Sequence, residues 1–222
     1  MGPSNRLPTG LRSLDSAFGG LEARRLYTVV GEEKSGRTTL ALQVASIASG
    51  RGLEVFWLDC GGKLHPARLK SLMDWWGADL TRIKFSMPEN FSEQLRLVIW
   101  ACDYAMEPGL IVLDDFTYLH RVEATGVPSR DKWIYKMLAF QSALLREATR
   151  TRDITAIAVS DIHEKPGLGV PQPVAGSIVS YYSDGELWLQ SVEAGLRLLK
   201  LKVGERSVSL RVRIFEGGFL ED

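Results

Sequence analysis

Nine consecutive residues combine glycine, hydroxyl and charged side chains in the order Gly31-Glu32-Glu33-Lys34-Ser35-Gly36-Arg37-Thr38-Thr39. They follow an apolar run at residues 26–30 and precede a segment whose apolar residues have helical spacing. A strand that turns through glycines into a helix presents free backbone N–H groups and the positive end of the helix dipole to an anion. All nine residues are therefore candidates for a phosphate-binding loop.

One position of this loop is unusual, because Arg37 stands where such a loop normally holds lysine. An ammonium is compact and fits between two phosphates, whereas a guanidinium is wide and planar. Thr38 supplies a hydroxyl of the kind that binds Mg²⁺, and Lys34 is a second cation that can reach in from the loop. The sequence predicts weak binding of ATP or ADP with Mg²⁺. The alternative is a glycine-containing turn without a ligand.

A second motif is the apolar run at residues 110–113, which ends in Asp114 and Asp115. An apolar strand that ends in a carboxylate near a phosphate loop is typical of a site that holds Mg²⁺. We expect Asp114 to hold the ion through a water molecule. Because side chains alternate along a strand, Asp115 is expected to point the other way, so the two carboxylates are not predicted to form a catalytic pair.

The apolar pattern predicts an α/β fold. Four short apolar runs, typical of buried parallel strands, lie at residues 26–30, 55–58, 110–113 and 154–159. Segments with helical spacing separate them, which indicates β-α-β units and a mostly parallel central sheet flanked by helices. Near the end, residues 196–203 and the alternating residues 208–214 predict an antiparallel hairpin that extends the sheet. We expect a single domain over residues 1–222.

The composition excludes several classes of protein. The 222 residues contain 27 basic and 27 acidic side chains, so the formal net charge is zero and bulk attraction to nucleic acid is excluded. No segment has the apolar length of a signal peptide or a membrane span, and only two cysteines occur. We therefore expect a cytoplasmic protein without a membrane partner.

Three segments resemble the RecA/RadA recombinase core and its KaiC-like relatives. They are the ladder Thr9-Gly10, Leu14-Asp15 and Gly19-Gly20, the segment at residues 57–68 (WLDCGGKLHPAR), and the segment at residues 171–178 (PQPVAGSI). The resemblance extends from about residue 7 to the end of the chain. It implies a RecA-like P-loop core without the helical N-terminal domain of the recombinases, as in short archaeal RadA paralogues of the RadB kind.

The sequence departs from this family at three positions that carry chemistry. The resemblance places Gly61 where the family has its catalytic glutamate, and glycine cannot act as a general base. It places Asp161 where a glutamine senses the γ-phosphate, and an anion there repels phosphate. Together with Arg37, these changes predict an inactive or very slow ATPase. The alternatives are a KaiC-like regulatory ATPase and an interaction subunit that binds no nucleotide.

The resemblance also places two DNA-binding loops, at residues 118–133 and 162–176. Their candidate DNA contacts are Arg121, Arg130, Lys132, His163 and Lys165. Acidic residues lie among them, so we expect weak binding to single-stranded DNA.

The partner implied by the resemblance is a RadA-type recombinase or another paralogue, whose strand exchange this protein is expected to modulate. The family polymerises through a Phe-x-x-Ala motif in a linker ahead of the core. Residues 140–143 (FQSA) match its letters, but their helical spacing predicts packing in the core. We therefore expect no long self-filament.

Overall fold

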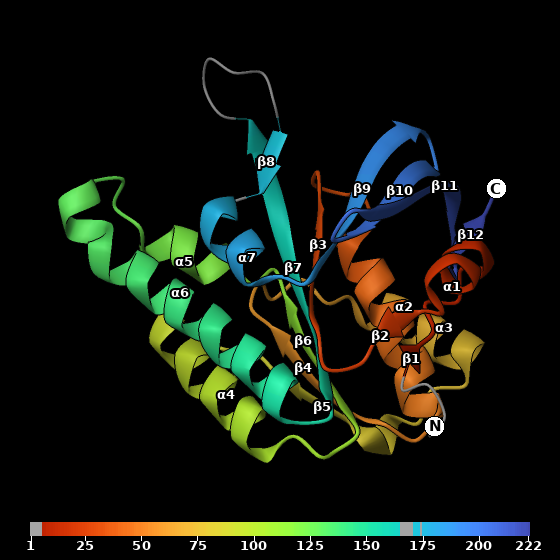
Figure 1. Cartoon of the computed structure of the whole chain (residues 1–222), viewed down its shortest axis with the longest axis horizontal. Coiled ribbons are helices and arrows are strands. Elements are labelled where there is room, and N and C mark those ends of the chain that lie inside the picture. Colours follow the sequence, from red (N-terminus) through yellow and green to blue (C-terminus); the bar gives the residue numbers. More distant parts are fainter. Residues whose placement is uncertain (1–5, 165–170, 174) are drawn as a thin grey trace.

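The computed structural model describes residues 6–164, 171–173 and 175–222. One large sheet runs through the protein, with helices on both faces (Figure 1). Its strands lie in the order β12-β11-β10-β9-β3-β7-β6-β4-β5, and β8 pairs with β7 beside this path. A second sheet joins the short strands β1 and β2.

The strands of both sheets have these bounds: β1 (Arg6–Leu7), β2 (Leu21–Glu22), β3 (Leu26–Gly31), β4 (Glu54–Asp59), β5 (Ile83–Ser86), β6 (Gly109–Asp114), β7 (Ile154–Glu164), β8 (Pro171–Pro173), β9 (Gly185–Glu193), β10 (Leu196–Val203), β11 (Arg206–Phe215) and β12 (Gly218–Glu221). The helices are α1 (Arg12–Phe18), α2 (Arg37–Gly50), α3 (Pro66–Trp76), the 3-10 turn η1 (Leu80–Arg82), α4 (Phe91–Tyr104), α5 (Tyr118–Glu123), α6 (Pro128–Thr151) and α7 (Gly176–Tyr182).

The predicted α/β architecture is confirmed. Six adjacent strands of the sheet are parallel to one another, in the order β9-β3-β7-β6-β4-β5. Strands β9 to β12 then continue antiparallel, so the C-terminal extension is a four-stranded meander rather than the predicted hairpin alone. The hairpin prediction left out β9, in which only the first half alternates between buried residues, such as Leu187 and Leu189, and less buried ones.

The sheet separates two apolar cores. On one face, α2 and α3 pack against residues such as Val29, Val112 and Leu199. On the other face, α4, α5, α6 and α7 cover Leu26, Ile111 and Ala158. Helix α2 is buried without interruption from Leu40 to Ser49, because α3, β12 and the central strands of the sheet all contact it. This enclosure fixes the helix whose N-terminus follows the phosphate loop.

The N-terminal ladder has a structural role. The Asp15 carboxylate accepts hydrogen bonds from the backbone N–H groups of Thr9 and Gly10, at 2.9 and 3.1 Å, and from the Thr9 hydroxyl at 2.8 Å. The carbonyl of Thr9 in turn accepts a 2.8 Å hydrogen bond from the buried side chain of Gln43 on α2. The ladder therefore ties the start of the chain to the helix behind the phosphate loop.

The expectation that residues 140–143 pack in the core is only half right. Gln141 and Ser142 are buried, but the side chain of Phe140 is 46% exposed. Helical geometry explains the difference, because consecutive residues of α6 point in directions 100° apart. No helix in the described part of the chain is long and apolar enough to cross a membrane.

His120 of α5 gives a testable pH dependence. Its ring is buried between the rings of Phe91 and Tyr135, at centroid distances of 6.0 and 4.8 Å, and neither ring nitrogen has a hydrogen-bond partner among the described residues. Burial lowers the pKa of His120, although Asp131 opposes the shift and Arg121 adds to it. The folded protein thus keeps the ring neutral while the unfolded chain binds a proton.

Stability from this residue is therefore present above its unfolded pKa and is lost as the pH falls. We expect the unfolding free energy, measured by urea denaturation, to decrease from pH 7 to pH 5 more steeply for the natural protein than for His120→Phe. Parallel curves for the two proteins would contradict this assignment.

Candidate phosphate-binding site

The site lies at the carboxyl ends of the central strands. Gly31 at the end of β3 is in register with Asp161 of β7, and Asp59 at the end of β4 is in register with Asp114 of β6. Because neighbouring parallel strands end at the same edge of the sheet, residues distant in sequence meet there. A cavity of about 310 Å³ opens at this edge, directly above the N-terminus of α2.

The loop between β3 and α2 has a conformation that favours glycine at one point. Gly36 has a φ of 101°, and a Cβ atom there would lie 2.5 Å from the ring of Phe219 on β12. Arg197 of β10 holds the loop from outside, donating hydrogen bonds to the carbonyls of Ser35 at 3.1 Å and Lys34 at 3.2 Å. The role of Arg197 could not be predicted, because this residue lies in a hairpin strand distant in sequence from the loop.

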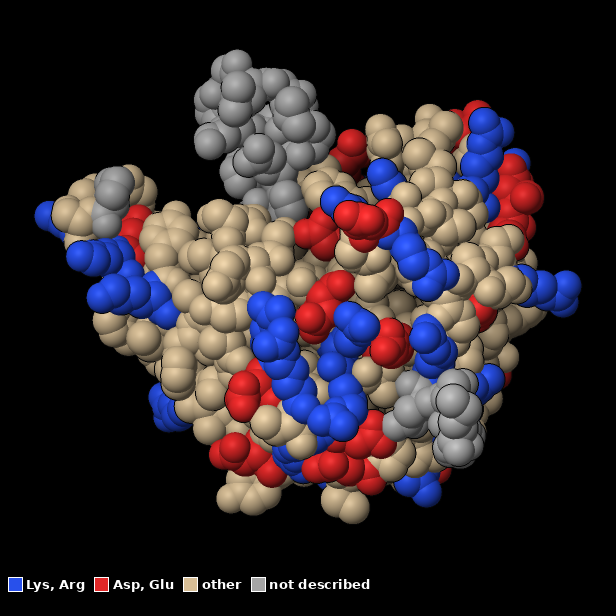
Figure 2. All heavy atoms as spheres, viewed as in Figure 1, with Lys and Arg blue, Asp and Glu red and all other residues tan. Residues whose placement is uncertain are grey.

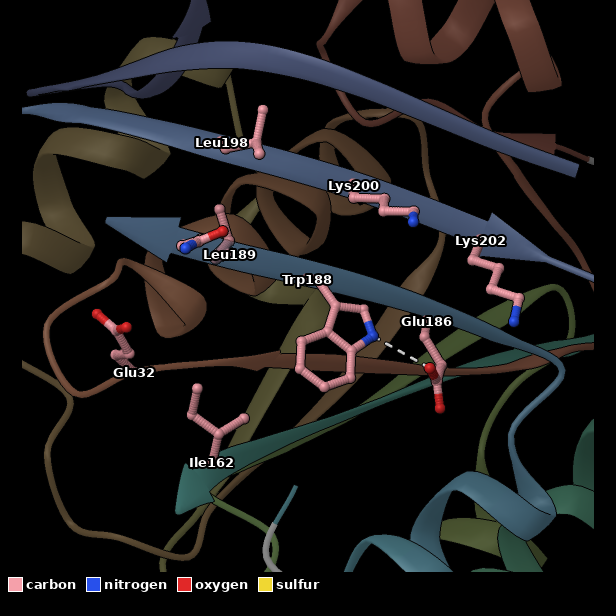
Figure 3. Close-up of a pocket in the computed structure, with 9 residues that line it drawn as sticks. Glu32, Ile162, Glu186, Trp188, Leu189, Leu198, Lys200 and Lys202 are labelled. Atoms are coloured by element: carbon pink, nitrogen blue, oxygen red, sulfur yellow. Dashed lines mark hydrogen bonds between the residues drawn. The ribbon is translucent and has the colours of Figure 1, made fainter. Parts of the chain in front are cut away.

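Most of the predicted loop residues face the cavity. Those that line it are Glu33, Lys34, Gly36, Arg37, Thr38 and Thr39. Glu32 instead lines a second hollow, whose other lining residues lie on β7, β9 and β10. Figure 3 shows Trp188 across this second hollow, with its indole N–H 3.1 Å from Glu186 and with Lys200 and Lys202 on the neighbouring strand. Two lysines and two glutamates balance there, so this hollow has no net attraction for an anion.

Thr38 and Asp114 are brought together as a magnesium site requires. The Thr38 hydroxyl donates a 2.9 Å hydrogen bond to Oδ1 of Asp114. Burial raises the pKa of Asp114 to about 7, with the bond from Thr38 opposing the shift and the neighbouring Asp59 and Asp115 adding to it. A hydroxyl and a carboxylate are hard oxygen ligands of the type that Mg²⁺ prefers. The donor set therefore fits a nucleotide with Mg²⁺.

Arg37 and Asp161 form a buried ion pair, with side chains 10% and 13% exposed. Two departures from the family thus compensate each other, because the arginine neutralises the carboxylate. Arg121 of α5 also donates a 2.9 Å hydrogen bond to Asp161, so this carboxylate has two cationic partners. Its predicted repulsion of phosphate is reduced accordingly. The Nη1 atom of Arg37 is buried and has no hydrogen-bond partner among the described residues.

Asp115 corrects the expectation that the two carboxylates point apart. Strand β6 ends at Asp114, and Asp115 already has a left-handed φ of 54°, so strand alternation no longer applies to it. Both carboxylates line the same cavity. Lys63, from the segment after β4, donates a 2.9 Å hydrogen bond to Oδ2 of Asp115 and lines the cavity as well. Neither Lys63 nor Asp115 was predicted to be a site residue.

Asp115 occupies the space next to Gly61, where the resemblance places the family's glutamate side chain. A Cβ atom built on Gly61 would lie 2.9 Å from Oδ2 and 3.0 Å from Cβ of Asp115. The carboxylate of Asp115 therefore fills the space that a side chain at position 61 would enter.

The candidate DNA contacts differ in whether they are exposed to solvent or paired with carboxylates. Arg130 and Lys132 are exposed in the first turns of α6, whereas Arg121 is turned toward Asp161 and Asp115. His163 lies in β7, but its side chain and all of Lys165 are outside the described residues.

The first loop is largely helical. Helices α5 and α6 flank a short connection, whose Thr125 and Gly126 donate backbone N–H hydrogen bonds to Asp131 in the first turn of α6. These bonds lower the pKa of Asp131, and its side chain is buried. This acid therefore stabilises the connection and does not lie among the exposed cations. Elsewhere on the face seen in Figure 2, basic and acidic side chains are interspersed, as zero net charge leads one to expect.

A sequence profile of the Rad51 family matches residues 5–209. The chain belongs to the Rad51 family. A curated relative, the DNA repair and recombination protein RadB of Pyrococcus abyssi, is 28% identical over 202 residues, which cover 88% of this chain and 84% of RadB. The protein RecA of Streptomyces avermitilis is 30% identical over 224 residues, which cover 96% of this chain. That match takes in 55% of RecA, so the chain spans about half the length of its bacterial RecA relatives.

The fold is also similar to a solved structure. The crystal structure of the RadB recombinase superposes with a TM-score of 0.77 at 28% identity, covering 97% of this chain and 99% of that one. The RecA-like core and the resemblance to RadB that the sequence predicted are therefore confirmed for this member of the Rad51 family.

Proposed function

We propose that this Rad51-family protein is an accessory factor of DNA recombination and repair. It binds ATP or ADP with Mg²⁺ weakly, hydrolyses ATP little or not at all, and modulates a RadA-type recombinase on single-stranded DNA. One observation carries the proposal: Thr38 and Asp114 meet beside the phosphate loop, while Gly61 offers no base and Asp115 fills the space beside it. The groups that would bind nucleotide and Mg²⁺ are present, but the residue that would activate water is not.

The residues have separate roles in this proposal. The loop N–H groups and the start of α2 bind phosphates, and Thr38 and Asp114 hold the magnesium ion, which neutralises phosphate charge. Arg37 neutralises Asp161 and lines the cavity, and its Nη1 has no hydrogen-bond partner among the described residues. Gly61 has no side chain that could take a proton from water. Nucleotide therefore acts as a structural ligand.

Two observations support contacts with other macromolecules. Arg130 and Lys132 remain exposed on α6, which is what weak contact with single-stranded DNA needs. Several aromatic side chains are also exposed on α4 and α6, where large apolar groups favour a protein partner: Trp100, Tyr104, Trp133 and Phe140. These exposed groups support docking to a recombinase or another paralogue.

The proposal is tested by two measurements on the natural chain. We expect ATP turnover to stay close to the uncatalysed background with and without single-stranded DNA. We also expect strand exchange by a RadA-type recombinase to change rate when this protein is added. Thr38→Val is the matched control, because it removes the magnesium-binding hydroxyl without changing the shape of the side chain.

The outcomes separate the alternatives. Turnover stimulated by single-stranded DNA to the level of a recombinase would contradict the slow-ATPase assignment and favour a regulatory ATPase. An equal effect of the natural protein and Thr38→Val on strand exchange would favour an interaction subunit that needs no nucleotide. No effect of either protein would refute the modulatory role.

A further inference from the structure

Five charged side chains form a continuous chain beside the phosphate cavity, and three of them, Lys63, Asp115 and Arg37, line it. They alternate in sign, in the order Lys63, Asp115, Arg121, Asp161 and Arg37. The separations are 2.9 Å for Lys63 and Asp115, 3.7 Å for Asp115 and Arg121, and 2.9 Å for Arg121 and Asp161, and Arg37 is in direct contact with Asp161. Three cations and two carboxylates leave this chain with one net positive charge.

The two ends of the chain are both cations, and both line the phosphate cavity. Among the described residues, Lys63 and Arg37 each pair with one carboxylate only, whereas the central Arg121 has two. Two polar atoms of the chain, Nη1 of Arg37 and Oδ1 of Asp115, are also buried without a hydrogen-bond partner in the described part of the protein. An anion in contact with both ends would complete the alternation of charges.

Lys63 is suited to change partners. Its side chain is 55% exposed, while that of Asp115 is 8% exposed, so the ammonium is the mobile member of this pair. A lysine is a point charge on a flexible stem, and it redirects its three donors with little strain. Arg37 is held in place by Asp161 and lacks this freedom.

We propose that Lys63 is a relocated phosphate-binding lysine, which makes this site prefer a nucleoside triphosphate to a diphosphate. The inference rests on the proposed nucleotide binding and adds the residue that distinguishes ATP from ADP. In a loop of this kind, backbone N–H groups cradle the inner phosphates and a lysine reaches the outer ones. Arg37 occupies the loop position of that lysine, and Lys63 approaches the same cavity from the segment after β4. The terminal phosphate is bound between Lys63 and Arg37.

The test compares the affinities of the full-length protein for ADP and for a non-hydrolysable ATP analogue, both with Mg²⁺, by calorimetric titration. We expect the natural protein to bind the analogue about tenfold more tightly than ADP, because a charge-assisted hydrogen bond contributes about that factor. Lys63→Met should lose about this factor for the analogue and change ADP affinity little. Lys70→Ala, which removes an exposed lysine paired with Asp74 on α3, is the control and should change neither.

A second variant tests the exchange of partners. Asp115→Asn removes the carboxylate that competes for Lys63, so the analogue should bind roughly threefold more tightly than to the natural protein. If Asp115 instead held the magnesium ion, its loss would weaken binding, and the inference would be wrong. Equal affinity of the natural protein for both nucleotides, unaffected by Lys63→Met, would overturn this inference alone. Absence of any nucleotide binding by the natural protein would overturn the proposed nucleotide function as well.

Discussion

Replacing Asp161 with alanine is expected to lower the free energy of unfolding by about 3 kcal/mol. The reason is that Arg37, with a side chain only 10% exposed, loses its partner and remains a buried charge. Arg121 loses its 2.9 Å hydrogen bond at the same time. Urea denaturation measures the change. A loss below about 1 kcal/mol would show that water already reaches this pair and stabilises Arg37 on its own.

An exposed ion pair in the same protein serves as the control. Lys70 and Asp74 are in contact one turn apart on α3, with side chains 77% and 64% exposed. Removing Asp74 is expected to cost at most about 0.5 kcal/mol, because solvent screens such a pair. The double variant Arg37→Ala with Asp161→Ala should be more stable than Asp161→Ala alone, since it leaves no buried charge behind. Additive losses would contradict the coupling of the two residues.

Much of this site could be predicted from the sequence because its parts lie at strand ends. An apolar run followed by glycines and Thr38 indicates a loop, and an apolar run ending in Asp114 indicates the strand beside it. In a parallel sheet such ends meet at one edge, and the structure places the two side chains 2.9 Å apart. Local pattern and general topology were sufficient for this part of the site.

The charged partners could not be predicted, because nothing local determines them. Whether Arg37 faces Asp161 or solvent depends on how β7 and α2 pack. Asp115 was assigned to the wrong direction because strand alternation was extended one residue too far, into a position with φ 54°. Lys63 lies in a segment without periodicity, and its contact with Asp115 appears only in three dimensions.

The C-terminal strands show the same limit at the level of the fold. Alternation revealed β10 and β11, but the role of β12 depends on distant residues. The backbone N–H of Phe219 donates a 2.7 Å hydrogen bond to the buried side chain of Gln43, and the Phe219 ring lies over Gly36 of the loop. The last strand thus holds the helix and the loop of the phosphate site in place. The short sequence of β12 does not reveal this role.

Restoring the family's glutamate is expected to need two substitutions. In Gly61→Glu alone, the new Cβ atom would lie 2.9 Å from Oδ2 of Asp115, which Lys63 and Arg121 hold in place. This variant should be less stable than the natural protein and no faster in ATP hydrolysis. Asp115→Ser alone opens space but supplies no base, so its turnover should also remain at the natural level.

The double variant Gly61→Glu with Asp115→Ser has both the base and the room for it. We expect its ATP turnover to exceed that of the natural protein about 100-fold, because a positioned general base contributes at least this factor. Single-turnover hydrolysis with ATP in excess of the dissociation constant measures the chemical step, and a parallel ADP titration confirms that the loop still binds. A double variant that binds nucleotide but hydrolyses it no faster would show that the pair of Arg37 and Asp161, rather than the missing base, limits the reaction.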